Sequence, residues 1–394
     1  MQTPYKINFS GRGHKYTQEE IDIVIDVMQN ADPLTQSVYR NEFERKFSDY
    51  TGVKHSFAVM NATAGLEIAG MLCQFEEGDE LIAPAHTFTS SVYPFIKHGA
   101  KIIWADINPD TRVIDAEIIS KLISPKTKAI LVVHLYGYLA DMEEISELAK
   151  KNNLLVIEDA AQAIGTDLNG KKAGSFGDIS VFSFHSHKNI TTLGEGGMIC
   201  TDNESFAKII PKIRHNGHTA FDFEQEEYWL PAMGNLDIPE LNGKPIMPAN
   251  FCLGEVECAL GSKLLDRIDK INSFRRNRAL RLIDEFTNDK RISFHRVDSN
   301  RHNYHQLIAQ ISDNKRNNFM KIMSENKKIK CILPYYPLYK NTFYKKLNLG
   351  EADCPYTEKF FDSMCSLPFH QWLSEEDFEY MINSIKESLS EIKF

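Results

Sequence analysis

Residues 178–200 read DISVFSFHSHKNITTLGEGGMIC and hold a single lysine, Lys188, between two apolar runs. DISVFSFH is rich in β-branched and aromatic residues and GGMIC begins a second apolar run, so both predict strands. Gly194, Gly196 and Gly197 exclude a helix between the runs, because glycine is a poor helix former. The sequence therefore predicts a lysine on a loop that is fixed at both ends, where its amine can react with a carbonyl carbon.

A second apolar run, LLVIEDAAQAIG at residues 154–165, predicts a strand that ends at Glu158 and Asp159. Ligands of open α/β sheets bind at the carboxyl ends of the strands, so the acid and the amine are expected at one edge. Pyridoxal phosphate needs both, an amine for an imine and a carboxylate for its ring nitrogen. Taken singly, each residue has a plainer alternative: Lys188 as a solvated charge and Asp159 as a helix cap.

EDAAQ at residues 158–162, followed by GDISVFSFHSHKNITTLGEGG at 177–197, resembles the paired signatures of the DegT/DnrJ/EryC1/StrS sugar aminotransferases. The resemblance covers nearly the whole chain and is strongest between residues 50 and 200. It implies an α/β protein of pyridoxal phosphate fold type I, similar to aspartate aminotransferase, with a mostly parallel central sheet and a smaller C-terminal α+β domain. It also implies pyridoxal 5'-phosphate bound as a Schiff base to Lys188, with Asp159 as the second catalytic residue at the ring nitrogen.

The resemblance assigns further cofactor contacts. In HSFAVMNATAGLEIAGMLCQ (55–74), a strand turns into a helix whose free amide groups can bind an anion, so Thr63 and Ala64 are expected at the phosphate; an ordinary helix cap is the alternative. Asn61 and Ala62 depart here from the family's Ser-Gly-Thr-Ala turn. Three more residues are implied: Phe88 stacked on the ring, Gln162 at the ring or its phenolic oxygen, and Ser183 at the phosphate. By residue type alone, Phe88 could belong to the core and Ser183 could bond to the backbone.

Apolar strands and helical segments alternate from about residue 56 to 200, which predicts a mostly parallel sheet covered on both faces. Helices are predicted at 17–29, 40–50 and 374–392, one long helix at 255–286, and a strand at 302–311. We expect two domains: residues 1–255, comprising an N-terminal segment and the large cofactor-binding domain, and residues 256–394, the smaller C-terminal domain.

Composition excludes several classes of protein. The chain has 394 residues, a formal charge of −9 and no Lys/Arg block, which argues against nucleic acid as a partner. Its longest apolar run is too short to span a membrane and its start lacks the apolar core of a signal peptide, so a cytoplasmic protein is expected. The seven scattered cysteines suit reduced thiols. His185 and His187 have no third ligand nearby, so no metal site is predicted.

The stretch from 214 to 250 is long, punctuated by Pro and Gly, and without periodicity. Its aromatic residues argue against disorder, and we interpret it as a specificity loop or part of a dimer contact; they are Phe221, Phe223, Tyr228 and Trp229. Asn250 keeps the asparagine that in the family reaches the partner subunit's phosphate, which implies a homodimer with shared active sites. Phe251 and Cys252 replace the family's Tyr and Arg, and Tyr335 replaces a His near the substrate.

These features predict an aminotransferase that moves an amino group from L-glutamate to a keto or aldehyde sugar for surface polysaccharide or lipopolysaccharide. The long insertion and the missing arginine resemble the members that make 8-amino-3,8-dideoxy-octulosonate. The alternatives are a nucleotide-4-keto- or 3-keto-6-deoxysugar aminotransferase, a pyridoxal phosphate-dependent sugar dehydratase, and a non-catalytic regulator. Dehydratases of the family replace the lysine with histidine, so Lys188 favours amino transfer.

Overall fold

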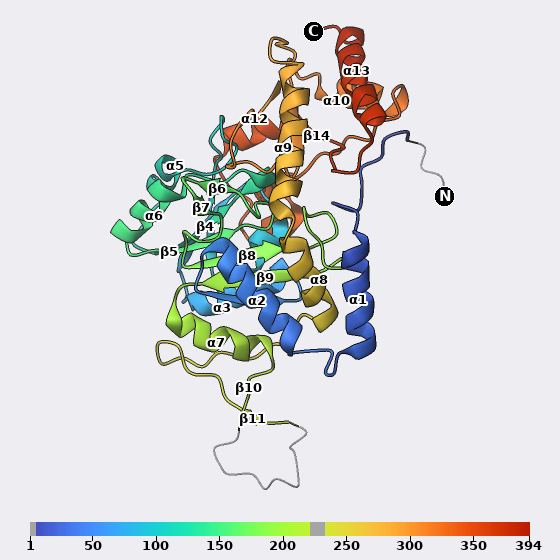
Figure 1. Ribbon diagram of the computed structural model, residues 1–394. Helices are drawn as coiled ribbons and strands as arrows, with labels where there is room; N and C mark the ends of the chain where they lie inside the picture. Colours follow the sequence, from blue (N-terminus) through green and yellow to red (C-terminus); the bar gives the residue numbers. More distant parts are fainter. Residues whose placement is uncertain (1–4, 221–232) are drawn as a thin grey trace.

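A seven-stranded sheet is the centre of the fold in the computed structural model, which describes residues 5–220 and 233–394 (Figure 1). β9 runs antiparallel to both of its neighbours, and the other pairings are parallel. The mostly parallel sheet and the α/β fold class are thus confirmed. In order across the sheet, the strands are β1 His55–Val59, β9 Gly197–Thr201, β8 Ile179–Ser183, β5 Leu155–Asp159, β4 Thr127–Val133, β2 Glu80–Pro84 and β3 Lys101–Ala105.

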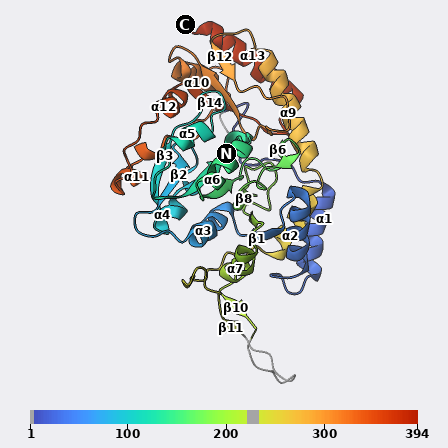
Figure 2. The same cartoon turned by 90° about the vertical axis from the view of Figure 1, so that its left-hand side faces the viewer.

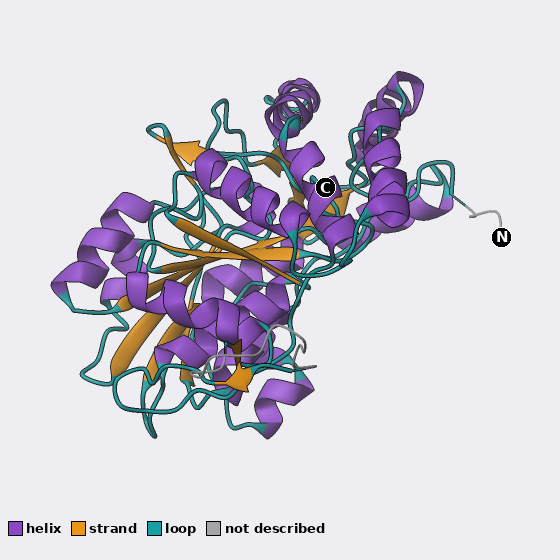
Figure 3. Cartoon of the chain, turned by 60° about the horizontal axis from the view of Figure 1, so that its bottom comes forward, coloured by secondary structure: helices purple, strands orange, loops and turns teal. Residues whose placement is uncertain are grey.

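Helices lie on both faces of this sheet (Figure 3). α3 packs directly on β8 and β9, because Gly65 lets the helix approach: a Cβ on Gly65 would lie 2.8 Å from Cγ1 of Val181. Asn61 caps this helix, and its side chain accepts the N–H of Ala64. The elements around the sheet are α2 Val38–Thr51, α3 Ala62–Cys73, η1 Thr89–Ser91, α4 Tyr93–Lys97, α5 Ala116–Ser120, η2 Leu135–Gly137, α6 Met142–Lys151 and α7 Glu204–Arg214.

The first helix, α1 Gln18–Asn30, begins with a complete capping box, in which Thr17 and Glu20 each accept the other's backbone N–H. α1 and α2 both pack against α8 Glu255–Leu265, so the N-terminal helices lie beside the large core (Figure 1). The predicted helices near 17–29 and 40–50 are therefore present, with ends shifted by one or two residues.

The single long helix expected at 255–286 is wrong: the chain forms α8 and then α9 Ile268–Asp284. Arg267 leaves the helical conformation with φ −120° and ψ 6°. Its guanidinium donates to both carboxylate oxygens of Glu20 and to the carbonyl of Lys15. Glu20 and Lys15 are distant from Arg267 in the sequence, so helical periodicity alone does not predict that the helix is interrupted at Arg267.

A second core lies in the C-terminal part, around an antiparallel sheet of β12 Ile292–Phe294, β13 Leu307–Ile311 and β14 Met364–Leu367. Ile7 from the N-terminal segment joins this core, and its backbone exchanges hydrogen bonds with Lys328 and Lys330. The helical elements of this part are α9, α10 Arg316–Glu325, η3 Leu338–Lys340, α11 Thr342–Lys346, α12 Pro355–Ser363 and α13 Glu375–Glu391. The boundary at residues 255 and 256 remains a prediction.

The stretch after α7 carries a short antiparallel ribbon, β10 His218–Thr219 with β11 Asn235–Leu236. Figures 1 and 2 show this ribbon projecting beyond α7, at the end of the molecule opposite α13. Residues 221–232 lie outside the described part of the chain, and with them the prediction about Phe221, Phe223, Tyr228 and Trp229.

All seven cysteines are free thiols, and five of them are buried. Burial raises the pKa of Cys73 and Cys200 to about 12, so both are protonated at neutral pH. Within 5–220 and 233–394, no helix combines the length and the apolar character that crossing a bilayer requires.

Gly261 lets α8 approach α2, because a Cβ there would lie 2.5 Å from Cζ of the fully buried Phe43. We expect Gly261→Ala to lower the free energy of unfolding by about 1–3 kcal/mol through overpacking, although alanine is the better helix former. Thermal and denaturant unfolding measure this change. Ser262→Ala is the matched control, because it removes a buried hydroxyl that has no hydrogen-bond partner and should not destabilise. A Gly261→Ala protein as stable as the parent would contradict the packing argument.

Candidate active site

Four of the predicted site residues come together at the carboxyl edge of the central sheet. Asp159 ends β5, and the parallel strand β8 lies next to it, leading into the loop that holds Lys188. The charge of Asp159 acts on both Lys188 and Tyr335, and Tyr335 contacts Gln162 and Phe88. The sheet topology thus places the predicted amine and acid at one site.

Lys188 is partly buried, on a loop tied to the N-terminal segment. Its backbone N–H donates to the carbonyl of His185 at 2.8 Å, and the N–H of Gly13 donates to the carbonyl of Ser186 at 2.8 Å. Burial lowers the pKa of the Lys188 amine to about 8, and the charge of Asp159 acts in the opposite direction. A minor fraction of the amine is therefore neutral near neutral pH, and this is the form whose nitrogen attacks a carbonyl carbon.

Asp159 is only 4% exposed and is held by two hydrogen bonds. Its Oδ2 accepts the hydroxyl of Ser91 at 2.6 Å, and its Oδ1 accepts the N–H of Ala161 at 3.1 Å. These contacts fix the carboxylate while leaving room for a further partner on its remaining lone pairs. The arrangement suits a carboxylate that faces a protonated ring nitrogen.

Glu158, the neighbour of Asp159 on β5, lies on the other face of the sheet because strand side chains alternate. It is fully buried, pairs with Nε2 of His134 at 2.9 Å, and accepts N–H groups of Gly174, Phe176 and Gly177. Burial alone would raise the pKa of Glu158, but His134 and these N–H groups hold that pKa below its usual value. Glu158 therefore organises the loop before β8, and only Asp159 faces the site.

Gln162 lies one turn beyond β5, and its side-chain amide forms hydrogen bonds with two tyrosines. Its Oε1 accepts the backbone N–H of Tyr136 at 2.8 Å, and its Nε2 donates to the hydroxyl of Tyr335 at 3.1 Å. Phe88 follows β2 and is 52% exposed, with its ring 6.0 Å from that of Tyr335. An exposed aromatic face beside a polar amide is suited to a flat ring ligand.

The predicted phosphate residues meet where β8 and β9 reach α3. Ser183 pairs with Gly197, and a Cβ on Gly197 would lie 2.6 Å from the carbonyl carbon of Asn61. Ser183 and the start of α3, with Thr63 in its first turn, are therefore close together. The N–H of Ala64 donates to the side chain of Asn61 at 2.9 Å. At Ala64 the structure therefore shows the ordinary helix cap that was the alternative to a phosphate contact.

Asn250 is exposed and lies before α8, next to Phe251, whose carbonyl accepts the N–H of Met60 just after β1. It forms an isolated antiparallel bridge with His215, at the end of α7. Its contact with a partner subunit's phosphate remains a prediction.

Sequence reasoning missed three residues that shape the site. Ser91 binds Asp159, Tyr136 binds Gln162 and stacks on Tyr335 at 6.0 Å, and Gly13 contacts the lysine loop. Ser91 and Tyr136 carry no local signal, because each of their contacts joins segments more than 25 residues apart in the sequence. Gly13 has one local hint, its place in the polar segment GRGHKY, because a glycine in such a segment often allows another backbone to approach closely.

Residues 14–386 match the model of the DegT/DnrJ/EryC1/StrS aminotransferase family. The chain belongs to this family. It is 38% identical to a GDP-perosamine synthase of Caulobacter vibrioides over 251 residues, covering 64% of this chain and 62% of that protein. It is 30% identical to the UDP-4-amino-4,6-dideoxy-N-acetyl-β-L-altrosamine transaminase of Campylobacter jejuni, covering 95% and 96% of the two chains.

Among solved structures, Spr1654 of Streptococcus pneumoniae in its PMP form, described as a putative sugar aminotransferase, is similar, with a TM-score of 0.86 and 26% identity. The match covers 96% of this chain and 98% of that one. The predicted family, fold class, enzyme class and cofactor are confirmed: the protein is an aminotransferase that uses pyridoxal phosphate.

The side chains present fit this cofactor. A partly buried amine of lowered pKa, an anchored carboxylate and the start of a helix are the three groups that its aldehyde, ring nitrogen and phosphate require. We therefore assign the aldehyde to Lys188, the ring nitrogen to Asp159, and the phosphate to the Ser183 and α3 end of the site. These assignments of individual residues are proposals that rest on the geometry.

The lowered pKa of Lys188 predicts how the cofactor-free protein captures pyridoxal phosphate. Only the neutral amine attacks the aldehyde, so the capture rate should rise with pH through a midpoint of about 8 and level off above it. A solvated lysine would instead give a midpoint of about 10.4. Stopped-flow absorbance measures the rate. Lys188→Ala should remove the capture phase altogether, and a midpoint near 10 in the parent would contradict the burial of the amine.

Gly13 is predicted to set the position of the lysine loop. A Cβ on Gly13 would lie 1.9 Å from the carbonyl oxygen of Lys188, so Gly13→Ala must displace backbone and should lower kcat/KM by about 100-fold. Steady-state kinetics measure this change. Gly11→Ala is the matched control, because its Cβ would lie 3.8 Å from Nε2 of His187, an ordinary contact, and the rate should be kept. Equal rates for both variants would show that Gly13 does not position the loop.

Proposed function

We propose that this protein transfers the amino group of L-glutamate to a keto or aldehyde carbon of a sugar that is built into a surface polysaccharide or lipopolysaccharide. The observation that carries the proposal is the Lys188 amine, with its pKa lowered to about 8, facing the anchored Asp159 at the sheet edge. Sugar-modifying enzymes among the relatives, including a perosamine synthase, support a sugar as the acceptor.

The residues have separate roles in this reaction. Bound pyridoxal phosphate supplies an aldehyde carbon for the amino group and a ring that delocalises an electron pair. Nζ of Lys188 takes the proton from the Cα of glutamate, and in the second half-reaction it returns a proton to the sugar carbon. Asp159 keeps the proton on the ring nitrogen, and Ser91 keeps Asp159 in place. Phe88 covers a ring face and excludes water there.

For the acceptor we propose the oxidised 3-deoxy-octulosonate that yields 8-amino-3,8-dideoxy-octulosonate. Cys252 stands where the family has an arginine, and its thiol contacts the carbonyl of Arg214 at 3.4 Å. Arg214 does not replace the missing cation, because its buried guanidinium pairs with Glu44 and the carbonyl of Ala58. The loss of this cation fits an acceptor without a nucleotide diphosphate.

Tyr335 supports the same acceptor, because it brings a neutral hydrogen-bonding group to the site. Burial raises the pKa of Tyr335 to about 12, so its hydroxyl keeps the proton and can donate it to an oxygen of the substrate. Its bond to Gln162 and its φ of +66° fix where that hydroxyl points.

A nucleotide-linked keto sugar is the second candidate acceptor. The relatives named above include a GDP-sugar synthase and a UDP-sugar transaminase, and this observation favours it. The two acceptors differ in whether they carry a nucleotide diphosphate, so the labelling assay described below separates them.

We also propose a homodimer that completes the active site. Asn250 is exposed, as a residue that reaches a partner's phosphate must be. Apolar side chains remain exposed on α1, on the segment after it and at the start of α2, which suits a subunit contact; they are Ile21, Ile25, Met28, Leu34 and Val38.

The acceptor is tested with purified holoenzyme, ¹⁵N-labelled glutamate, and a panel of keto and aldehyde sugars with and without a nucleotide. We expect mass spectrometry to find ¹⁵N in the nucleotide-free octulosonate. Nitrogen in a nucleotide sugar alone would replace the proposed acceptor by the second candidate and leave the aminotransferase assignment intact.

The reaction type is tested with glutamate alone. A transaminase changes the absorbance of its bound cofactor and releases one 2-oxoglutarate per site, whereas a dehydratase or a non-catalytic regulator releases none. Lys188→Ala should lose both signals while keeping the parent's circular dichroism spectrum.

A further inference from the structure

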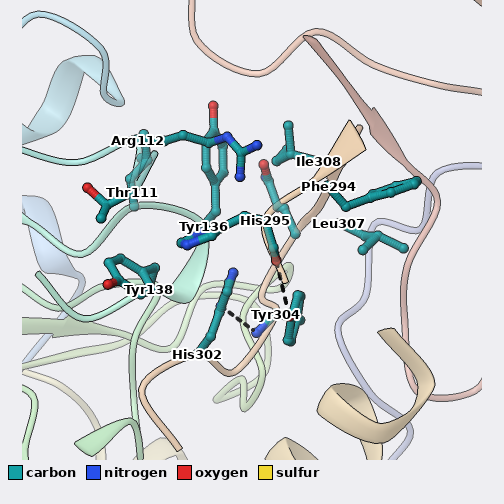
Figure 4. Close-up of a pocket in the computed structure, with 12 residues that line it drawn as sticks. Thr111, Arg112, Tyr136, Tyr138, Phe294, His295, His302, Tyr304, Leu307 and Ile308 are labelled. Atoms are coloured by element: carbon teal, nitrogen blue, oxygen red, sulfur yellow. Dashed lines mark hydrogen bonds between the residues drawn. The ribbon is translucent and has the colours of Figure 1, made fainter. Parts of the chain in front are cut away.

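A small pocket lies behind the active site, between the loop after β3 and the C-terminal sheet (Figure 4). Its volume is about 10 Å³, which is room for a single particle of the size of a water molecule. The pocket is lined by Thr111, Arg112, Leu135, Tyr136, Tyr138, Phe294, His295, His302, Tyr304, Gln306, Leu307 and Ile308.

Arg112 is a buried cation that forms no close ion pair within the described residues, although the charge of Asp110 acts on it. It is 6% exposed, and in residues 5–220 and 233–394 no carboxylate oxygen lies within 4.0 Å of its guanidinium. Nε and Nη2 both donate to one neutral acceptor, Oε1 of Gln310, at 3.2 and 2.6 Å. Nη1 is buried and has no hydrogen-bond partner. Because burial lowers the pKa of Arg112 only to about 10, the guanidinium stays charged at neutral pH.

The residues that line the pocket supply further polar atoms and no carboxylate, although the charge of nearby Asp110 also acts on Arg112. The hydroxyl oxygen of Thr111 and Oε1 of Gln306 are also buried without partners. Burial and the charge of Arg112 lower the pKa of His295 to about 3 and that of His302 well below its usual value, so both rings are neutral. In Figure 4 the guanidinium of Arg112 lies between Tyr136 and Ile308. Arg112 is therefore the charged side chain among the residues that line the pocket.

We propose that this pocket binds one halide ion, with chloride as the natural occupant, held by Nη1 of Arg112 and the hydroxyl of Thr111. A monoatomic anion matches a space for one particle, and it compensates a charge that a water molecule would leave uncompensated. Larger anions such as gluconate do not fit. Charge-assisted N–H bonds to an anion are stronger than those to neutral acceptors.

The ion would act on the active site through Tyr136, which lines the pocket and also contacts residues of the active site. Tyr136 lines the pocket, has φ +61°, gives its N–H to Gln162, and stacks on Tyr335 at 6.0 Å with an angle of 15°. The backbone carbonyl of Tyr136 also accepts the N–H of Gln306. A halide at Arg112 would thus stabilise the contact between the large sheet and the C-terminal sheet at the place where Tyr335 enters the site.

Bromide is the direct probe of this site, because it scatters X-rays anomalously. Crystals of the holoenzyme grown in gluconate and soaked in sodium bromide should give an anomalous peak within hydrogen-bonding reach of Nη1 of Arg112. A water-sized peak without anomalous signal, or no peak, would overturn the proposal.

Thermal unfolding in solution gives a second test. Replacing sodium gluconate by sodium chloride at constant ionic strength should raise the Tm of the holoenzyme by about 2 °C at saturation. The rise should vanish in Arg112→Met and shrink in Thr111→Val, which keeps the shape of the side chain.

Arg296→Gln is the matched control, because Arg296 is exposed and paired with Asp284, so this variant should keep the chloride response. A response that persists in Arg112→Met, or one that Arg296→Gln also loses, would show a general salt effect and contradict the site. If Arg112→Met does not fold, Thr111→Val and the bromide peak still decide the question.

Discussion

The proposed active site depends on the burial of one amine beside one anchored carboxylate. Desolvation disfavours the charged form of Lys188 and lowers its pKa to about 8, whereas the charge of Asp159 works against that change. Were Asp159 closer and unshared, it would hold the amine protonated and unreactive. The hydrogen bonds that it accepts from Ser91 and Ala161 hold the carboxylate in place. They use only part of its acceptor capacity, so Asp159 can also accept a hydrogen bond from a cationic ring nitrogen.

The rest of the large domain holds these two groups in place. Glu158 and His134 form a fully buried pair on the opposite face of β5 and fix the loop that leads into β8. Gly13 secures the other side of the lysine loop through a backbone hydrogen bond. An N-terminal segment and a strand pair that are distant in the sequence therefore share the task of positioning Lys188.

The C-terminal part contributes to the same site through Tyr335. Tyr335 forms a hydrogen bond with Gln162 and contacts the ring of Phe88. Its own ring stacks on Tyr136, which also lines the pocket of Arg112. The proposed substrate contact and the contact between the two cores thus use the same aromatic pair. The replacements at Cys252 and Tyr335 concern the proposed substrate side of the site, whereas Asn61 and Ala62 depart from the family at the α3 start assigned to the phosphate.

The sequence by itself determined the family and the fold class, and it predicted the roles of the lysine and the acid, because all of these depend on local sequence features: apolar strands, glycine turns and a carboxylate at a strand end. It also predicted most helices, since caps and periodicity are local. Only the tertiary structure decided the break between α8 and α9, the two opposite roles of Glu158 and Asp159, and the contacts of Ser91, Tyr136 and Gly13. Burial of a charge such as Arg112 was equally hidden, because desolvation and missing partners are properties of packed neighbours that one segment does not reveal.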